Sequence, residues 1–222
     1  MFGKLSHART AGIAVSCAAV AMALGAGPAQ ADSSTTVSPA GASVATANMG
    51  PVSFGSGVSA VDCYTGTTSG GSVPAAPGNK NVSGPVSVSL GPWTLSKCDI
   101  GESDRTIKVT TTGTWVVVAQ NGSPIAADLV IPQGGLTITT SGAVNCTTVY
   151  APDGPATVAG TYTNSVDNGG LKSLPTMTVR DLVPSRTTGD TSCSTGNSWD
   201  RVSATLILNN PAEPGNMITV GP

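Results

Sequence analysis

Short runs in which apolar and polar residues alternate recur along the chain from Val52 onward, and turn residues separate them. Alternation of this kind is typical of β-strands, because successive side chains of a strand point to opposite faces of the sheet. In the longest run, Arg105–Gln120, Ile107 and Lys108 lie on opposite faces, and the pattern holds until Gly113 interrupts it, where we expect a bulge. Further strands are predicted at Val58–Tyr64, Val86–Leu90, Trp93–Ser96, Ile125–Ile131, Leu136–Thr140, Ala143–Tyr150, Thr157–Thr163, Thr176–Leu182, Arg201–Leu208 and Met217–Val220.

The turn signals between these runs indicate how the strands connect. Asn121-Gly122 favours a tight hairpin turn, and Gln133-Gly134-Gly135 and Ser141-Gly142 follow the next two strands. The four strands between Arg105 and Tyr150 are therefore predicted to form a meander. About ten short strands predict an all-β fold, an antiparallel two-sheet β-sandwich of the Ig-like or Greek-key type.

The first residues have the order of a secretory signal peptide. Lys4 and Arg9 precede an apolar run from Ala11 to Leu24, and Ala29-Gln30-Ala31 follows that run. We expect cleavage after Ala31, so that residues 1–31 are a signal peptide and the mature protein is secreted and extracellular. Because the apolar run is shorter than the roughly 20 residues that span a bilayer, no membrane span is expected in the mature protein.

The mature chain is expected to begin with a flexible arm. Residues 32–50 consist mainly of Ser, Thr, Ala, Pro and Gly and include almost no large apolar side chain. Such a segment buries too little surface to offset the entropy that it loses on ordering. The β-sandwich domain is therefore predicted to occupy residues 51–222.

Composition and charge limit the classes of molecule that the protein is expected to bind. Of the 222 residues, 54 are Ser or Thr, whereas only 10 are basic and 12 acidic. Removal of Lys4 and Arg9 with the signal peptide leaves 8 basic and 12 acidic residues, a formal charge of 8 − 12 = −4. Such a chain lacks the basic patch that neutralises phosphates, so nucleic acid is excluded as a partner.

Four cysteines remain in the mature chain: Cys63, Cys98, Cys146 and Cys193. An even number of cysteines in an oxidising compartment predicts two disulfides, and three pairings are open. We favour Cys63 with Cys98 and Cys146 with Cys193, because each pair then closes a local unit. No Cys-x-x-Cys spacing occurs, which argues against a redox or zinc site.

The two cysteine-bridged segments resemble each other. Ala60-Val61-Asp62-Cys63 is similar to Ala143-Val144-Asn145-Cys146. Two interpretations stay open. Either residues 51–120 and 136–210 are pseudo-repeats, or cysteine-bridged β segments of this composition look alike without any duplication.

Four segments of the mature chain occur in a recognisable order after the signal peptide and the Ser/Thr-rich arm. They are Val86-Ser-Val-Ser-Leu-Gly-Pro-Trp-Thr-Leu-Ser-Lys-Cys98, Gly113-Thr-Trp115, Asn145-Cys146 and Gly160-Thr-Tyr-Thr-Asn-Ser165. With this order the chain resembles a group of uncharacterised secreted β-sandwich proteins of actinobacteria. The resemblance covers most of the mature chain and implies export and a β-sandwich. It carries no catalytic residue and implies no activity.

Candidate chemistry is limited by the absence of histidine from the mature chain, since the only one, His7, lies in the predicted signal peptide. Ser-His-Asp and Cys-His nucleophile systems and the usual zinc sites all need imidazole. We therefore expect no catalytic residue, no cofactor and no enzymatic activity. The carboxylates of Asp99, Glu102 and Asp104 cluster in one polar loop, which we interpret as a solvated turn. The alternatives are a hydrolase that uses these groups and a calcium site made of them.

The three tryptophans are the remaining candidates for ligand contact. Trp115 lies in the apolar run Thr114–Val118 and is assigned to the core, whereas Trp93 and Trp199 lie near strand ends. Two exposed tryptophans on one surface would suit the stacking of sugar rings or the grip of a protein partner. Trp93 and Trp199 are therefore the candidate ligand-binding residues.

These features together predict a secreted, non-enzymatic β-sandwich protein with a surface-association or binding role. Its partner is not identified by the sequence, and the cell envelope, an extracellular protein and a polysaccharide are all compatible. One alternative is a carbohydrate-binding module that uses Trp93 and Trp199. Another is a secreted protease inhibitor in which the loop Arg186–Ser192 is the bait.

Overall fold

The computed structural model describes residues 34–55, 60–101 and 104–222, and these residues form strands and turns without a helix. The predicted signal peptide, residues 1–31, lies outside the described residues. In chain order the strands are β1 (Thr35–Ser38), β2 (Ser43–Asn48), β3 (Val52–Phe54), β4 (Val61–Ser72), β5 (Lys80–Asn81), β6 (Val86–Gly91), β7 (Trp93–Asp99), β8 (Arg105–Thr111), β9 (Trp115–Gln120), β10 (Ile125–Ile131), β11 (Leu136–Gly142), β12 (Cys146–Tyr150), β13 (Ala156–Val158), β14 (Gly160–Thr163), β15 (Asp167–Asn168), β16 (Leu171–Lys172), β17 (Thr176–Gly189), β18 (Gly196–Asn209) and β19 (Thr219–Gly221).

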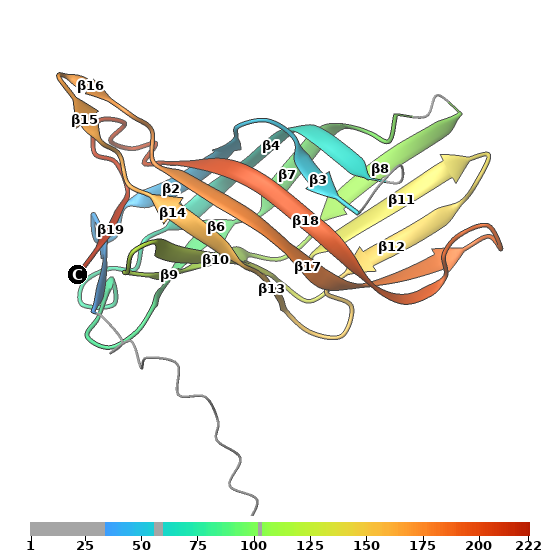
Figure 1. Cartoon of the computed structure of the whole chain (residues 1–222), viewed down its shortest axis with the longest axis horizontal. Coiled ribbons are helices and arrows are strands. Elements are labelled where there is room, and N and C mark those ends of the chain that lie inside the picture. The colour runs from blue at the N-terminus through green and yellow to red at the C-terminus, as the bar shows by residue number, and fades with distance from the viewer. Residues whose placement is uncertain (1–33, 56–59, 102–103) are drawn as a thin grey trace, which may run out of the picture. The chain divides into compact units, whose positions relative to one another are not determined.

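The strands pair antiparallel and build packed layers, so the predicted all-β sandwich is confirmed (Figure 1). Pairing runs from β2 through β4, β6, β9, β10, β14, β17 and β18 and returns to β2. Several of the strands are only two to four residues long, and β1, β5 and β19 form a small sheet of their own. Among the described residues, no helix has the length and apolarity needed to cross a bilayer.

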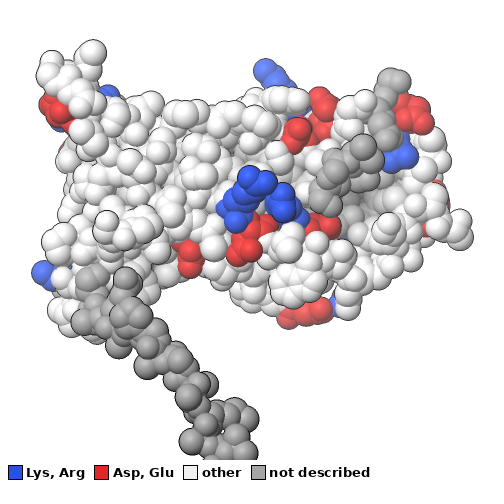
Figure 2. All heavy atoms as spheres, viewed as in Figure 1, with Lys and Arg blue, Asp and Glu red and all other residues white. Residues whose placement is uncertain are grey.

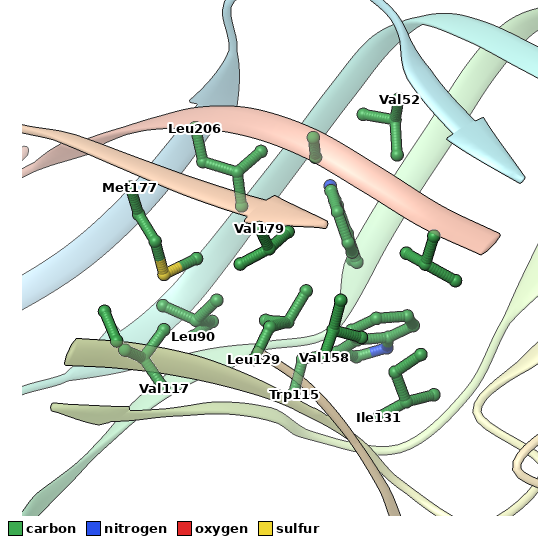
Figure 3. Packing of buried hydrophobic residues seen from close by; sticks show 14 of the residues in the cluster. Val52, Leu90, Trp115, Val117, Leu129, Ile131, Val158, Met177, Val179 and Leu206 are labelled. Carbon is green, nitrogen blue, oxygen red and sulfur yellow. The ribbon is translucent and has the colours of Figure 1, made fainter. Parts of the chain in front are cut away.

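The hydrophobic core lies between the layer of β17 and β18 and the layer of β6, β9 and β10 (Figure 3). Met177 and Leu206 on the first layer face Leu90 and Leu129 on the second, and all four side chains are 0% exposed. Alternation along each strand brings these residues to the inner faces. Each such side chain stabilises the fold by roughly 1.5–3 kcal/mol through burial.

One long hairpin with a kink runs through the fold from Arg105 to Gly142. On one side of the kink β9 pairs with β10, and on the other side β8 pairs with β11. Between these two ladders the amide of Thr112 donates a hydrogen bond to the carbonyl oxygen of Gly135 at 3.0 Å. The pairing therefore continues across the kink, and the predicted single strand Arg105–Gln120 is divided into β8 and β9.

The predicted meander is wrong at Gln133-Gly134-Gly135, where the chain bends but does not reverse. Gly113 has a positive φ of 72°, and a methyl group added to it would lie 3.0 Å from Cγ of Pro132. Only glycine adopts this conformation readily at such a close approach. The two strands consequently kink together, and β11 continues beside β8 instead of folding back onto β10.

β17 and β18 form a second long hairpin, paired from Thr176↔Ile207 to Thr187↔Gly196. The other edge of β17 pairs first with β14 and then, near its end, with β12. Since β12 pairs with β11 and β11 with β8, these three strands extend the layer beside the turn of the β17–β18 hairpin (Figure 1).

The prediction of a flexible arm is wrong for residues 34–50, which contain β1 and β2. Val37 and Val44 are 0% and 1% exposed, and β2 pairs with both β4 and β18. The buried hydroxyl of Thr46 donates to that of Thr68 at 3.0 Å. β2 is ordered despite its small side chains because it lies between β4 and β18, which cover its backbone and bury its valine. The composition of the segment alone did not indicate these neighbours.

The predicted disulfide pairing is confirmed. Cys63 and Cys98 lie opposite each other on β4 and β7, with Cα atoms 4.0 Å apart. Cys146 of β12 is bonded to Cys193 in the turn between β17 and β18, with Cα atoms 5.8 Å apart. Because one bridge joins neighbouring strands and the other joins a strand to a turn, the bridges give no support to 51–120 and 136–210 as pseudo-repeats.

Candidate functional site

A cavity of about 440 Å³ lies where β8, β11 and β12 meet the turn end of the β17–β18 hairpin, and we call it the terminal cavity. Its volume falls within the roughly 300–1,000 Å³ of small-molecule sites. The polar residues that define it include Thr148, Tyr150, Thr187, Ser192, Ser198 and Asp200. The apolar ones are Val61, Ile100, Ile138, Val144 and the Cys146–Cys193 disulfide. Arg105, at the start of β8, also lines it.

Charged side chains are unevenly distributed over the surface. On the face drawn in Figure 2, most of them lie over the centre and the right-hand half, the half in which Figure 1 places β8, β11 and β12. Much of the left-hand half is uncharged, as the abundance of Ser and Thr leads one to expect. The terminal cavity therefore lies in the half that carries more charged side chains on this face.

Alternation along β18 places Ser198 and Asp200 at the terminal cavity and Trp199 on the opposite face of the sheet. Ser185 of β17 is paired with Ser198, and the Ser185 hydroxyl donates a hydrogen bond to Oδ2 of Asp200 at 2.7 Å. This bond orients the carboxylate and occupies only one of its oxygens among the described residues. Asp200 is therefore held as a hydrogen-bond acceptor at the cavity.

Tyr150, the last residue of β12, contributes a buried phenol to the cavity lining. Its side chain is 2% exposed, and its ring packs edge to face on Phe54 with centroids 5.8 Å apart. Burial raises the pKa of the Tyr150 phenol far above its ordinary value, and the negative charge of Asp200 raises it further. The phenol therefore keeps its proton at neutral pH, and within the described part of the chain it has no hydrogen-bond partner.

Threonines on neighbouring strands supply a hydroxyl wall. The hydroxyls of Thr148 on β12 and Thr187 on β17 lie 2.9 Å apart and are hydrogen-bonded to each other. On β11, Oγ1 of Thr140 accepts a hydrogen bond from the amide of Cys146 at 3.2 Å. These contacts fix the side chains on three adjacent strands, so this wall is formed before any ligand arrives.

The turn between β17 and β18 is fixed against the cavity. Oδ2 of Asp190 accepts hydrogen bonds from the amide of Asn145 at 2.8 Å and from its Nδ2 at 3.1 Å. Gly189 approaches the backbone of Asn145 so closely that an added methyl group would collide with its carbonyl oxygen. With the disulfide at Cys193, these contacts make the rim a rigid part of the cavity.

The described lining of the terminal cavity offers hydroxyls, a phenol and one carboxylate as hydrogen-bonding groups. Among the described residues that line the cavity, Asp200 is the one carboxylate, whereas glycoside hydrolysis needs two facing carboxyl groups. Within residues 34–55, 60–101 and 104–222, no group of three or more His, Cys, Asp or Glu side chains is placed to hold a metal ion.

The predicted pairing of Trp93 and Trp199 on one ligand surface is wrong. Trp93 is 2% exposed and packs against Trp115 in the core, whereas Trp199 is 66% exposed. Trp93 begins β7, and a strand end was expected to be accessible. The missing side chain of Gly66 leaves room for its indole, since a methyl group there would lie 3.1 Å from Nε1 of Trp93.

The carboxylates of the loop after β7 are only partly described. Oδ1 of Asp99 accepts a hydrogen bond from the amide of Gly101 at 3.0 Å, as a turn-forming aspartate does. Asp104 lies just before β8, and Glu102 falls outside the described residues. The interpretation as a solvated turn fits Asp99, and the calcium and hydrolase alternatives for the trio stay untested.

The prediction of an exposed bait loop at Arg186–Ser192 is wrong for Arg186. Arg186 lies inside β17, which is paired with β12 on one side and β18 on the other. Its guanidinium forms an ion pair with Asp153 at 2.8 Å and donates to Oδ1 of Asn197 at 2.9 Å. A side chain held in the middle of a sheet is not displayed to a protease as an inhibitor loop displays its bait.

Comparison with known proteins adds no functional information: no protein-family model, no curated protein and no solved structure matches this chain. The resemblance to secreted proteins of actinobacteria therefore stays a prediction.

Sequence reasoning did not identify Tyr150, Asp200, Ser198 or Arg105 as members of one site. A signal was available for β18, because Ser198, Trp199 and Asp200 continue the alternation of the predicted strand Arg201–Leu208 toward its start. The convergence of β8, β12 and β18 depends on long-range pairing, which alternation within one strand does not encode.

Proposed function

We propose that this protein is an exported, non-enzymatic binding protein that receives a small polar ligand in the terminal cavity. The observation that carries this proposal is the preformed cavity itself, with its fixed threonine wall and disulfide-bound rim. A rigid site loses little conformational entropy on binding, which favours affinity. The proposal assigns the surface-association or binding role expected from the sequence to this cavity.

The non-enzymatic part of the proposal is supported by composition. The only histidine of the whole chain is His7, in the predicted signal peptide. The four cysteines after that segment form two disulfides, so none of them is a free thiol. A nucleophile in the cavity would therefore lack the imidazole base that commonly activates it. The hydroxyls, the phenol and the carboxylate are better used as hydrogen-bonding groups.

The extracellular part of the proposal is supported by the two disulfides, which are compatible with an oxidising compartment. Export with cleavage after Ala31 gives a mature chain that begins at Asp32. Mass spectrometry of the protein from culture medium tests this directly. A chain that keeps its first residues and stays in the cytosol with reduced cysteines would contradict export.

Two neighbouring threonines of β17 provide a test of the binding site. Thr187 lines the cavity, whereas Thr188, the next residue along the strand, is directed to the opposite face. We expect Thr187→Phe to fill part of the cavity and Thr188→Phe to leave it open, while both substitutions suit a strand.

The measurement is native mass spectrometry after equilibrium dialysis against the small-molecule fraction of culture medium. The wild type and Thr188→Phe should retain a ligand that Thr187→Phe does not. Thermal unfolding curves establish that all three proteins are folded under the conditions of the measurement. Retention by none of them, or equal retention by all three, would contradict the proposal.

A further inference from the structure

We infer that the terminal cavity binds a neutral, polyhydroxylated ligand of mono- or disaccharide size, with Asp200, Tyr150 and Ser198 as its hydrogen-bonding groups. This inference rests on the proposed function, because it names the ligand class of the same cavity.

The balance of charge in the cavity favours an uncharged ligand. Among the described residues that line the cavity, Arg105 is the one cation and Asp200 the one anion, so this part of the lining presents both signs of charge. A ligand with a net charge of either sign is therefore attracted by one of these two groups and repelled by the other. Like-charge contacts of this kind are a common means of rejecting a ligand.

The hydrogen-bonding groups suit hydroxyls, which both donate and accept. The carboxylate of Asp200 accepts only, and its orientation is set by Ser185 at 2.7 Å. The phenol of Tyr150 keeps its proton and is available as a donor. Ser198 serves in either sense, so the hydroxyls of a polyol match both the donors and the acceptors that these groups offer.

The apolar lining fits the remaining surface of a sugar ring. Val61, Ile100, Ile138 and Val144 offer aliphatic contact to the C–H groups of such a ring. A fully apolar ligand would remove water from Asp200 and Tyr150 without replacing its hydrogen bonds, which is unfavourable. A polyol with one apolar face satisfies both parts of the lining.

This site differs from the tryptophan platform that the sequence suggested. Trp199 lies on the face of β18 opposite to Ser198 and Asp200, and Trp93 is in the core. Saccharide binding at the cavity therefore predicts no change in affinity for Trp199→Ala, whereas a platform on the outer face predicts a loss.

The test is isothermal titration calorimetry of the full mature protein with neutral mono- and disaccharides, and with the corresponding uronic acids and amino sugars. At least one neutral saccharide should bind one to one, and its charged counterparts should bind at least about tenfold more weakly. Asp200→Asn should weaken binding about tenfold and Tyr150→Phe about fivefold, as expected for losing hydrogen bonds to a charged and to a neutral group.

The matched control is Asp62→Asn, which removes the same charge from a β4 residue that does not line the cavity. Its affinity should equal that of the wild type. If Asp200→Asn does not fold, Ser198→Ala decides instead, because Ser198 is exposed and its loss should still weaken binding.

The outcomes separate the ligand class from the function. If no neutral saccharide binds, or if charged counterparts bind equally well, the ligand class is overturned. In that case the proposed function would still stand if, in the dialysis experiment, the wild type retained a ligand that Thr187→Phe did not. Absence of both saccharide binding and any retained ligand would overturn both, and equal loss in Asp62→Asn and Asp200→Asn would remove the assignment of Asp200.

Discussion

Trp93 and Trp115 meet edge to face in the core, with ring centroids 4.8 Å apart and ring planes at 84°. Neither side chain is more than 2% exposed. This contact joins the start of β7 to the start of β9, two strands that do not pair with each other. An edge-to-face pair of this kind adds about 0.5–1.5 kcal/mol to the stabilisation from burial.

Trp93→Ala should lower the free energy of unfolding by about 3–5 kcal/mol, because it leaves a cavity and removes the contact with Trp115. Urea unfolding followed by circular dichroism measures the change. Trp199→Ala is the matched control and should change stability by no more than about 0.5 kcal/mol, since Trp199 is 66% exposed. Equal effects of the two substitutions would contradict the placement of these side chains.

Removal of residues 32–50 from the mature chain should prevent folding. Val37 and Val44 are buried, and loss of β2 exposes edges of both β4 and β18. The comparison is between a chain that begins at Asp32 and one that begins at Pro51. Well-dispersed amide resonances in the NMR spectrum of the shorter chain would show that the two N-terminal strands are dispensable.

The two disulfides should differ in their effect on ligand binding. Each closes a loop of 35 or 47 residues, and its loss lowers stability by at most about 4 kcal/mol in the chain-entropy model. Only Cys146–Cys193 lines the terminal cavity. The double variant Cys146→Ser/Cys193→Ser should therefore lose affinity under conditions where it is still folded.

The control for that experiment is Cys63→Ser/Cys98→Ser, which removes the bridge between β4 and β7. This variant should be destabilised to a similar extent and keep its affinity for the dialysed ligand. Native mass spectrometry below the unfolding temperature compares the two. Equal loss of ligand in both variants would indicate that the bridges act on binding through overall stability alone.

Two buried tyrosines should limit stability at alkaline pH. Burial raises the pKa of Tyr150 and of Tyr162, so the folded protein keeps both protons where the unfolded chain, with a pKa near 10, releases them. Their contribution is complete below about pH 10 and is lost as the pH rises above it. Each group contributes a slope of about 1.4 kcal/mol per pH unit in that range.

Tyr162→Phe should reduce the slope, as measured by urea unfolding from about pH 8 to about pH 12. At neutral pH it should also cost about 1 kcal/mol, because the Tyr162 hydroxyl donates to the carbonyl oxygen of Ile218 at 2.7 Å. Tyr64→Phe is the control, since the Tyr64 ring is 55% exposed. An unchanged alkaline slope in Tyr162→Phe would contradict the assignment.

The kink at Gly113 allows a paired glycine test. Gly113→Ala places a methyl group against Pro132, whereas Gly134→Ala, also at positive φ, meets nothing within 4 Å. The second substitution should cost about 1 kcal/mol from backbone strain alone, and the first should cost more. Urea unfolding compares them, and a smaller effect at Gly113 would show that its contact with Pro132 is not tight.

Local pattern was a good guide to strands and a poor one to their partners. The alternation within Ile125–Ile131 placed β10, and Asn121-Gly122 placed the turn before it, because both signals act over a few neighbouring residues. Gln133-Gly134-Gly135 was read as a reversal because glycines permit a turn and a kink equally. The choice between them depends on Gly113, which lies about twenty residues earlier in the chain.

Residue order was enough to indicate a β-rich chain with two disulfides and to favour the local pairing of its cysteines, because alternation and cysteine spacing are properties of neighbouring segments. The burial of Trp93, the ordering of residues 34–50 and the assembly of Tyr150, Asp200 and Arg105 around one cavity followed from contacts between distant strands. Such contacts depend on which strand edges meet and on the room that residues such as Gly66 leave. Hydrophobic burial is non-directional, so the composition of a segment alone does not specify the strands it packs against.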